Sequence, residues 1–432
     1  ANTGEGLADG FLPMTKRANG QFLLENVDLR GLEDGLHTAK VRVFNNTGSR
    51  PGLFSEFDIF FFVNRTYRGQ PIEGLITGNL RATQQRTASS TFNRADLLYV
   101  SNDSEYVYLG VAGRVDPSES LMNGFMAFLD TDPGSSTGVT NFATLKDDSG
   151  PATRLLSNRR WTAPPGFGAE FGLSYLRNSQ LNSAPESPLG GGLVRPFTVG
   201  AEAGAFRLQN PQWFTGIPAL MGYTPRMNSG ESPRGWETAI RLRDLYPNGV
   251  TGPAQLGVIV GLGTTGESGS TLLYTDPNFE VYGGRPLPNP WQSNQFLPAQ
   301  SSVIGDPGTN SVNLNLAQIV TLTASSAVPA ANYQISQVKG LSVEPVGRDE
   351  WSIMVEVKAL ANINGPIHLM VKPGNSATLV GGVPSLQDPT SQGIRIASSL
   401  AAGRSTRVNL FFRGPRTGFA PNFSLKFGNG YL

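Results

Sequence analysis

The sequence lacks several residue types on which much enzyme and cofactor chemistry depends. Its 432 residues include no cysteine and two histidines, His37 and His368. Without cysteine there are no disulfides, thiolate metal sites, CxxCH haem attachments or cysteine nucleophiles. Two histidines leave almost no material for a histidine-based metal site or a Ser/His/Asp triad, and we expect both to be structural.

Charge excess and long apolar runs are also missing. The 34 Lys and Arg residues nearly balance the 33 Asp and Glu residues, which gives a net charge of +1. No basic cluster suited to phosphates occurs, so the sequence predicts no nucleic-acid partner. No uncharged apolar stretch reaches the ~18 residues that a transmembrane helix needs. A hydrophobic share of 39% and an aromatic share of 9% are too high for a disordered chain.

Glycine and proline are abundant instead. The chain has 52 glycines and 31 prolines, scattered between apolar runs without a collagen-like period, as is typical of many turns. Apolar residues alternate with a period of two, which predicts β-strands, for example at 38–44, 106–112 and 351–358. Helical periodicity is scarce. We therefore predict an all-β protein of three antiparallel β-sandwich domains in tandem, with the first one incomplete.

The predicted organisation follows turn signals and changes in composition. Residues 1–20 form an extended arm, 21–70 a partial immunoglobulin-like domain, 71–310 a sandwich with long loops, and 311–432 a C-terminal sandwich, with a small-residue linker at 325–332. Strands at 97–100, 106–112 and 125–129 are expected to be consecutive in one antiparallel sheet. Residues 236–245 are expected to form a strand that runs into one helical turn.

Two acidic residues follow the apolar run at 125–129. Asp130 and Asp132 precede Pro133, Gly134 and a Ser/Thr-rich turn. Carboxylates beside turn carbonyls suit a hard cation such as Ca²⁺, which takes several oxygen ligands. An EF-hand does not fit, because Asn141 stands where its bidentate glutamate belongs. An Asx turn explains the same residues equally well, so calcium binding and a plain turn both stay open.

Other side chains suggest weaker alternatives. An exposed sugar-binding platform could be built from tryptophans in or beside the long loops, namely Trp161, Trp213, Trp236 and Trp291, although such residues more often pack loops onto a sandwich. A glycoside hydrolase would need two carboxylates about 5 to 9.5 Å apart. Candidates are Glu170, Glu202, Glu237 and Asp244, whose spacing gives this alternative no support.

One motif matches the dinucleotide-binding pattern. Gly261, Gly263 and Gly266 follow a buried strand with the spacing GxGxxG. That motif needs a helix after its third glycine, and the residues at 271–274 are strand-like instead. We therefore interpret the segment as a glycine-rich hairpin and expect no nucleotide cofactor.

Six segments between residues 73 and 300 resemble, in order, the DOMON-like sandwich of bacterial secreted proteins, which is akin to family 9 carbohydrate-binding modules. These segments are 95–102, 106–113, 128–134, 168–172, 236–242 and 293–298. Residues 32–64 resemble the closing half of an immunoglobulin-like module, and 364–371 with 402–412 resemble a fibronectin-like module. The resemblance implies an exported, non-catalytic multi-sandwich protein. Members of the middle family bind sugars or haem, but their haem ligands have no counterpart here.

These features together lead to one expected function and two alternatives. Ala1 is the kind of small residue that signal peptidase leaves, so we expect an exported, cell-surface protein, although a trimmed chain would begin in the same way. An incomplete first sandwich has an open edge that another strand can fill. We expect a structural or adhesive subunit, not an enzyme, that self-assembles into a filament or lattice by N-terminal strand exchange. Carbohydrate binding, with surface glycans as partners, and glycoside hydrolysis are the alternatives.

Overall fold

The computed structural model covers the chain with gaps. It describes residues 15–16, 22–23, 35–45, 53–63, 69–70, 72, 74, 76, 80–83, 94–114, 122–135, 137–145, 151–157, 161–177, 195–196, 203–209, 213–217, 219–223, 233–265, 281–282, 285–286, 296–298, 305–306, 311–338 and 350–432. Strands up to residue 63 are described by their backbone. The chain divides into two compact units, Ala1–Gln70 and Pro71–Leu432.

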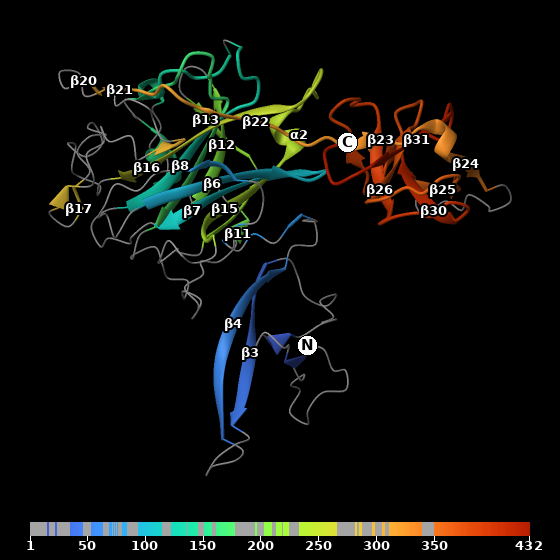
Figure 1. Cartoon of the computed structure of the whole chain (residues 1–432), viewed down its shortest axis with the longest axis horizontal. Helices are drawn as coiled ribbons and strands as arrows, with labels where there is room; N and C mark the ends of the chain where they lie inside the picture. Colours follow the sequence, from blue (N-terminus) through green and yellow to red (C-terminus); the bar gives the residue numbers. More distant parts are fainter. Residues whose placement is uncertain are drawn as a thin grey trace. The chain divides into compact units, whose positions relative to one another are not determined.

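The first unit contains two antiparallel two-stranded sheets (Figure 1). These are β1 (Thr15–Lys16) with β2 (Phe22–Leu23), and β3 (Gly35–Asn45) with β4 (Leu53–Val63). In the β3–β4 register Lys40 lies opposite Asp58 and Arg42 opposite Glu56 on one face, which also carries the apolar pair Phe44 and Phe54. Positions on the other face are mostly apolar: Ala39, Val41 and Val43 opposite Ile59, Phe57 and Ser55.

The second unit begins with a large sandwich of two antiparallel sheets. Its seven-stranded sheet has the order β13-β12-β10-β8-β16-β19, with β22 also paired to β16. The strands are β8 (Met122–Asp130), β10 (Phe171–Arg177), β12 (Ala203–Gln209), β13 (Trp213–Gly216), β16 (Gln255–Thr265), β19 (Phe296–Leu297) and β22 (Gln318–Thr321).

The facing six-stranded sheet has the order β11-β14-β15-β7-β6-β5. Its strands are β5 (Leu80–Thr83), β6 (Arg94–Asn102), β7 (Tyr106–Arg114), β11 (Arg195–Pro196), β14 (Ala219–Tyr223) and β15 (Gly235–Arg241). Two small sheets accompany it: β17 (Val281–Tyr282) with β18 (Arg285–Pro286), and β9 (Trp161–Thr162) with β20 (Gly305–Asp306) and β21 (Ser311–Asn313).

Among the described residues, helices are few and short. They are η1 (Phe142–Thr144), α1 (Pro151–Leu156), α2 (Leu242–Leu245) and η3 (Ala330–Asn332). The predicted strand that runs into one helical turn is present as β15 followed by α2. In the described part of the chain, no helix has the length and apolar character needed to cross a membrane.

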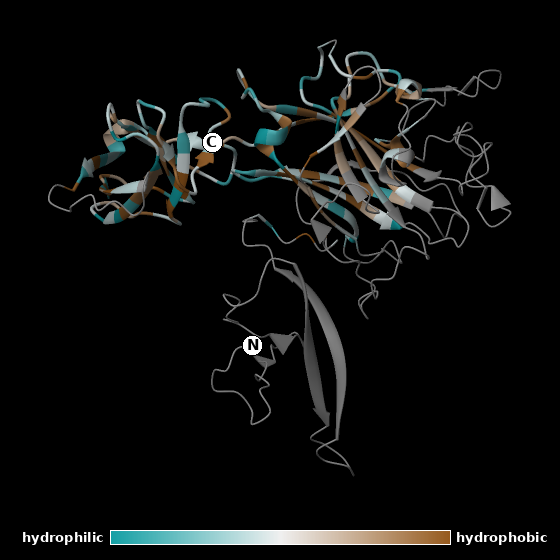
Figure 2. Ribbon diagram, turned by 180° about the vertical axis from the view of Figure 1, so that it is seen from behind, coloured by the Kyte–Doolittle hydropathy of each residue, from teal (hydrophilic) through white to brown (hydrophobic). Residues whose placement is uncertain are grey.

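The seven-stranded sheet is buried on both faces. Phe125, Ala127 and Leu129 of β8 lie in the core between the two sheets. Met126 and Phe128 of the same strand lie in a second core, which η1, α1 and β9 cover. Apolar residues, brown in Figure 2, accordingly lie along the strands of the sandwich. The continuous apolar run at 125–129 reflects this burial on both sides.

A second, smaller sandwich ends the chain (Figure 1). Its sheets have the orders β23-β31-β26-β29-β28 and β24-β25-β30-β27. The strands are β23 (Ser326–Ala327), β24 (Tyr333–Gln337), β25 (Glu350–Ala359), β26 (Ile367–Lys372), β27 (Thr378–Leu379), β28 (Val383–Pro384), β29 (Gln392–Ala397), β30 (Ser405–Arg413) and β31 (Asn422–Phe427).

The all-β prediction is confirmed, but three details of the prediction are wrong. β8 does not continue the sheet of β6 and β7, because it pairs with β10 and β16 in the opposite sheet. Strand β22 and the core residue Val320 belong to the large sandwich, so this sandwich extends beyond residue 310. The segment at 325–332 is not a linker, since β23 pairs with β31 and Val328 is a core residue.

Candidate metal centre

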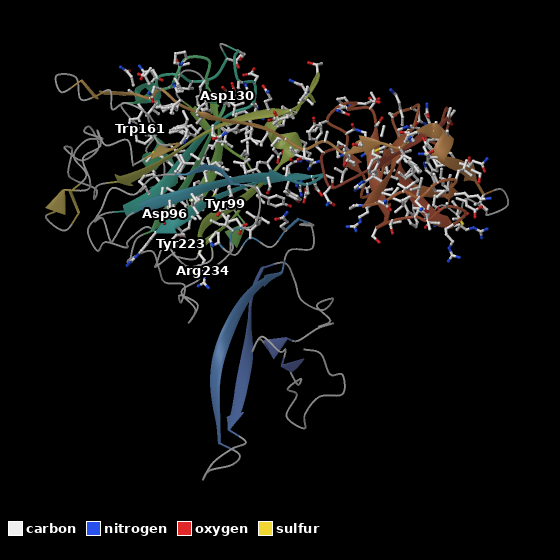
Figure 3. All side chains as sticks on the ribbon, in the orientation of Figure 1. Asp96, Tyr99, Asp130, Trp161, Tyr223 and Arg234 are labelled. Atoms are coloured by element: carbon white, nitrogen blue, oxygen red, sulfur yellow. The ribbon has the colours of Figure 1, made fainter. Side chains whose placement is uncertain are left out.

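The candidate centre lies at one end of the seven-stranded sheet, where β8 stops and β10 begins. In the β8–β10 register Phe171 lies opposite Leu129, and the Glu170 N–H donates to the Leu129 carbonyl at 3.0 Å. Glu170 is therefore placed beside Asp130, although 40 positions separate them in sequence. Figure 3 labels Asp130, the last residue of β8, and also Asp96 and Tyr99, which lie on β6 of the six-stranded sheet.

Asp130 is the buried member of the group, with 1% of its surface exposed. Its Oδ1 accepts the Asp132 N–H at 2.9 Å, and its Oδ2 accepts the Gly168 N–H at 3.0 Å. The first bond is the predicted Asx turn. Both carboxylate oxygens are thus held by main-chain donors from two different loops, which fixes the side chain where the loops meet.

Hydroxyl groups connect Asp132 and Glu170. The Thr137 Oγ1 donor lies 2.8 Å from Asp132 Oδ1 and 2.9 Å from Glu170 Oε1. Ser135 Oγ donates to Asp132 Oδ1 at 2.7 Å, and the Thr131 N–H donates to Glu170 Oε2 at 2.9 Å. The end of β8 and the loop after it therefore supply two carboxylates, Asp130 and Asp132, and three hydroxyl side chains around one point.

The three carboxylates have a spacing suited to a cation. One oxygen each of Asp130, Asp132 and Glu170 lies within 4.8 Å of the other two. Calcium binds oxygens at about 2.3–2.6 Å, so two ligands on opposite sides of the ion lie up to about 5 Å apart. One ion could contact all three residues, with the hydroxyls or water completing its shell. This oxygen-only donor set suits Ca²⁺ better than zinc, which favours nitrogen and sulfur.

The burial of the centre disfavours the ionised form of its carboxylates. Burial is the main cause that raises the pKa of Asp130, against the lowering effect of the Gly168 and Asp132 N–H donors. Burial also raises the pKa of Glu170, and the charges of Asp130 and Asp132 add to the increase, while the donors from Thr131 and Thr137 oppose it. A bound cation would stabilise the ionised form of both groups.

The tryptophans predicted to form a sugar platform are not together. Trp161 is 3% exposed and packs edge-on against Phe128 in the second core. Trp236 is fully buried between the sheets and stacks on Phe125. Burial therefore corrects the prediction for these two residues. Trp213 lies in β13, where the backbone is described, and Trp291 lies outside the described residues.

The candidate hydrolase carboxylates are also dispersed. Glu170 belongs to the acidic group described above, whereas the buried Glu237 lies on β15 of the other sheet and accepts the Gly74 N–H. Asp244 lies in α2, and Glu202 lies outside the described residues.

His37 is in β3 and His368 is buried in β26. Strand β16 continues through residues 261–265. A dinucleotide-binding motif would instead end its strand at the start of the glycine-rich segment.

Comparison with known proteins adds no assignment. No protein-family model matches the chain, and no curated protein matches its sequence. The resemblance to DOMON-like, immunoglobulin-like and fibronectin-like modules therefore stays a prediction.

Sequence reasoning missed Glu170 as a partner of Asp130. The signal that could have found it is the pairing of the strands at 125–129 and 171–175.

Proposed function

We propose that this chain is a non-enzymatic structural or adhesive subunit of a cell surface, exported from the cell, that assembles with copies of itself. The β3–β4 hairpin carries the proposal. Among the described residues of the first unit, β3 and β4 pair with each other alone, over 11 residues each. A two-stranded hairpin is marginally stable by itself, and its outer edges can accept further strands.

The register of the hairpin supports the same proposal. Residues of opposite charge face one another across one face, which stabilises a pair of antiparallel strands. The other face is mostly apolar, and its side chains gain stability only when another layer covers them. A strand or sheet from a second copy would pair with an outer edge of the hairpin and cover its apolar face. The arm at residues 1–20 is the segment we propose for this exchange.

Electron microscopy and sedimentation of the full chain test the assembly. We expect filaments or sheets from the native protein, and a critical concentration at least about tenfold higher for Val41→Lys, equivalent to ~1.4 kcal/mol. Thr38→Lys is the matched control, because position 38 lies on the face that carries the charged pairs. Monodisperse native protein at high concentration would contradict self-assembly. Assembly unchanged after deletion of residues 1–20 would contradict exchange of the arm.

We also propose that the large sandwich binds one Ca²⁺ at Asp130, Asp132 and Glu170. The observation that supports this is the convergence of three carboxylates from two loops within 4.8 Å. Such an ion would join the loop after β8 to the segment before β10, and so stabilise one end of the sheet. Its role would be structural, because both oxygens of Asp130 are already engaged by main-chain donors.

Thermal unfolding with and without calcium tests this centre. At a free calcium concentration of about 100 times Kd, the folded chain should gain about 2.7 kcal/mol, and excess chelator should remove this gain. Asp132→Asn should abolish most of the response. The control Glu105→Gln removes a carboxylate of the same sandwich that lies 3.9 Å from Arg241, and should leave the response intact. A melting temperature that does not depend on calcium would exclude the site.

A further inference from the structure

His368 occupies an unusual position on the five-stranded sheet of the C-terminal sandwich. It is 5% exposed, and its Nδ1 has no hydrogen-bond partner among the described residues. In the strand register it lies opposite Arg395 of β29 on one side and opposite Lys426 of β31 on the other. The neighbours Ile367 and Leu369 are core residues, so His368 lies on the face of the sheet that points away from this core.

The same outer face is covered by the segment at 385–388 and by the last residues of the chain. A Cβ added at Gly393 would lie 2.4 Å from Leu432 Cδ1, which places Leu432 directly on this face. Leu432 O accepts hydrogen bonds from Ser385 Oγ at 2.8 Å and from the Leu386 N–H at 2.6 Å. Lys426 Nζ donates to Gln387 Oε1 at 3.0 Å. The covering segment 385–388 is thus hydrogen-bonded to Lys426, which lies beside His368 in the sheet.

This cover also joins the two sandwiches of the second unit. Leu386 and Tyr431 pack into the core of the large sandwich. The Val250 N–H donates to Leu386 O at 2.8 Å, and the Ala254 N–H donates to the Tyr431 hydroxyl at 3.2 Å. Asn102 adds two bonds to the main chain of Thr323, at 2.7 and 2.9 Å. The junction contacts of Leu386 and Tyr431 therefore belong to the same two segments that cover the outer face of the sheet.

We propose that His368 is an acid-sensitive switch that loosens the junction between the two sandwiches when its imidazole takes up a proton. A positive charge would then be buried at His368, between the half-buried Lys426 and Arg395, whose side chain is exposed. The charges that act on His368 are those of Arg395 and Lys426, whereas the carboxylate of Asp388 in the cover acts on Lys426 and binds Lys372 of β26 at 3.3 Å. The junction segment 247–254 has no ionisable side chain. Hydration of the buried imidazolium requires the cover to move.

The direction of the pH effect follows from the same geometry. Burial lowers the pKa of His368, and the charges of Arg395 and Lys426 lower it further. The unfolded chain, with an ordinary histidine pKa of about 6.5, takes up this proton first as the pH falls. The contribution of His368 to stability is therefore present above about pH 6.5 and is lost as the pH falls toward the lowered folded pKa.

An NMR titration of the full chain tests the first step. Because the sequence has two histidines, ¹³C-labelled imidazoles give two titration curves, and His368→Gln identifies the curve of His368. We expect its midpoint below that of a free histidine, and a shift to higher pH in Arg395→Gln, which removes one flanking charge. A midpoint at or above the ordinary value of about 6.5 would overturn the proposal.

Hydrogen exchange tests the second step. After correction for the intrinsic rate, the Val250 and Ala254 amides of the native chain should lose protection between pH 7.5 and the His368 midpoint, by a factor set by the gap between that midpoint and the unfolded value of about 6.5. His368→Gln should keep its protection over this range, because glutamine does not titrate. If that variant does not fold, Arg395→Gln must move the loss of protection to higher pH together with the NMR midpoint. Protection that does not change with pH in the native chain would overturn the proposal.

Discussion

Replacing Trp236 by alanine should destabilise the large sandwich by about 3–5 kcal/mol, the range for removing a buried aromatic side chain. Trp236 is fully buried on β15 and its ring is parallel to that of Phe125 in the facing sheet, with 6.0 Å between ring centroids. The cavity would open at the contact between the two sheets, so neither sheet could fill it by a local shift. Chemical denaturation monitored by circular dichroism measures the loss.

Trp236→Phe is the informative control. The Nε1 group of Trp236 has no hydrogen-bond partner among the described residues, so phenylalanine removes volume without leaving a partner unpaired. We expect a much smaller loss than for alanine. A Trp236→Ala protein as stable as the native chain, but with reduced sugar binding, would contradict core packing and restore Trp236 as a member of the predicted glycan platform.

Strand positions could be predicted where one face of a sheet is buried and the other is exposed. The alternating segment of β25 shows this, since Trp351, Ile353, Val355 and Val357 are all buried in the core of the C-terminal sandwich, as predicted. Sheet membership of β8 could not be predicted. Its apolar run has no alternation because both of its faces are buried, and the sequence between β7 and β8 does not reveal a crossing to the other sheet.

The candidate centre could be predicted in part for a similar reason. Asp130 and Asp132 are neighbours in sequence, so local turn chemistry indicates them directly. Glu170 joins them through the register of β8 and β10, which is a long-range property that no local pattern contains. Helix α1 could not be predicted, because its six residues lie in a segment rich in glycine, serine and proline. Packing against the outer face of the seven-stranded sheet stabilises this helix, and not its helix propensity.

Replacing Gly168 by alanine should have the second large effect, at the candidate centre itself. A Cβ at this position would lie 1.7 Å from the Thr137 carbonyl oxygen, which is part of the main chain and cannot rotate away. Overpacking costs about 1–3 kcal/mol. Moving residue 168 also weakens the bond from its N–H to the Asp130 carboxylate, and hydrogen bonds to charged groups contribute about 1.5–3 kcal/mol. We expect a loss above about 3 kcal/mol by chemical denaturation, together with loss of the calcium response.

Gly134→Ala separates this collision from a general effect of alanine in the loop. Gly134 has a φ of +94°, and a Cβ there would meet no atom within 4 Å. Its replacement should therefore cost only the strain of the left-handed conformation, about 1–2 kcal/mol, and preserve calcium binding. Equal losses in both variants would show that the two loops are not in contact at Gly168. In that case Asp130 and Glu170 would no longer be held together, and the three-carboxylate centre would lose its structural basis.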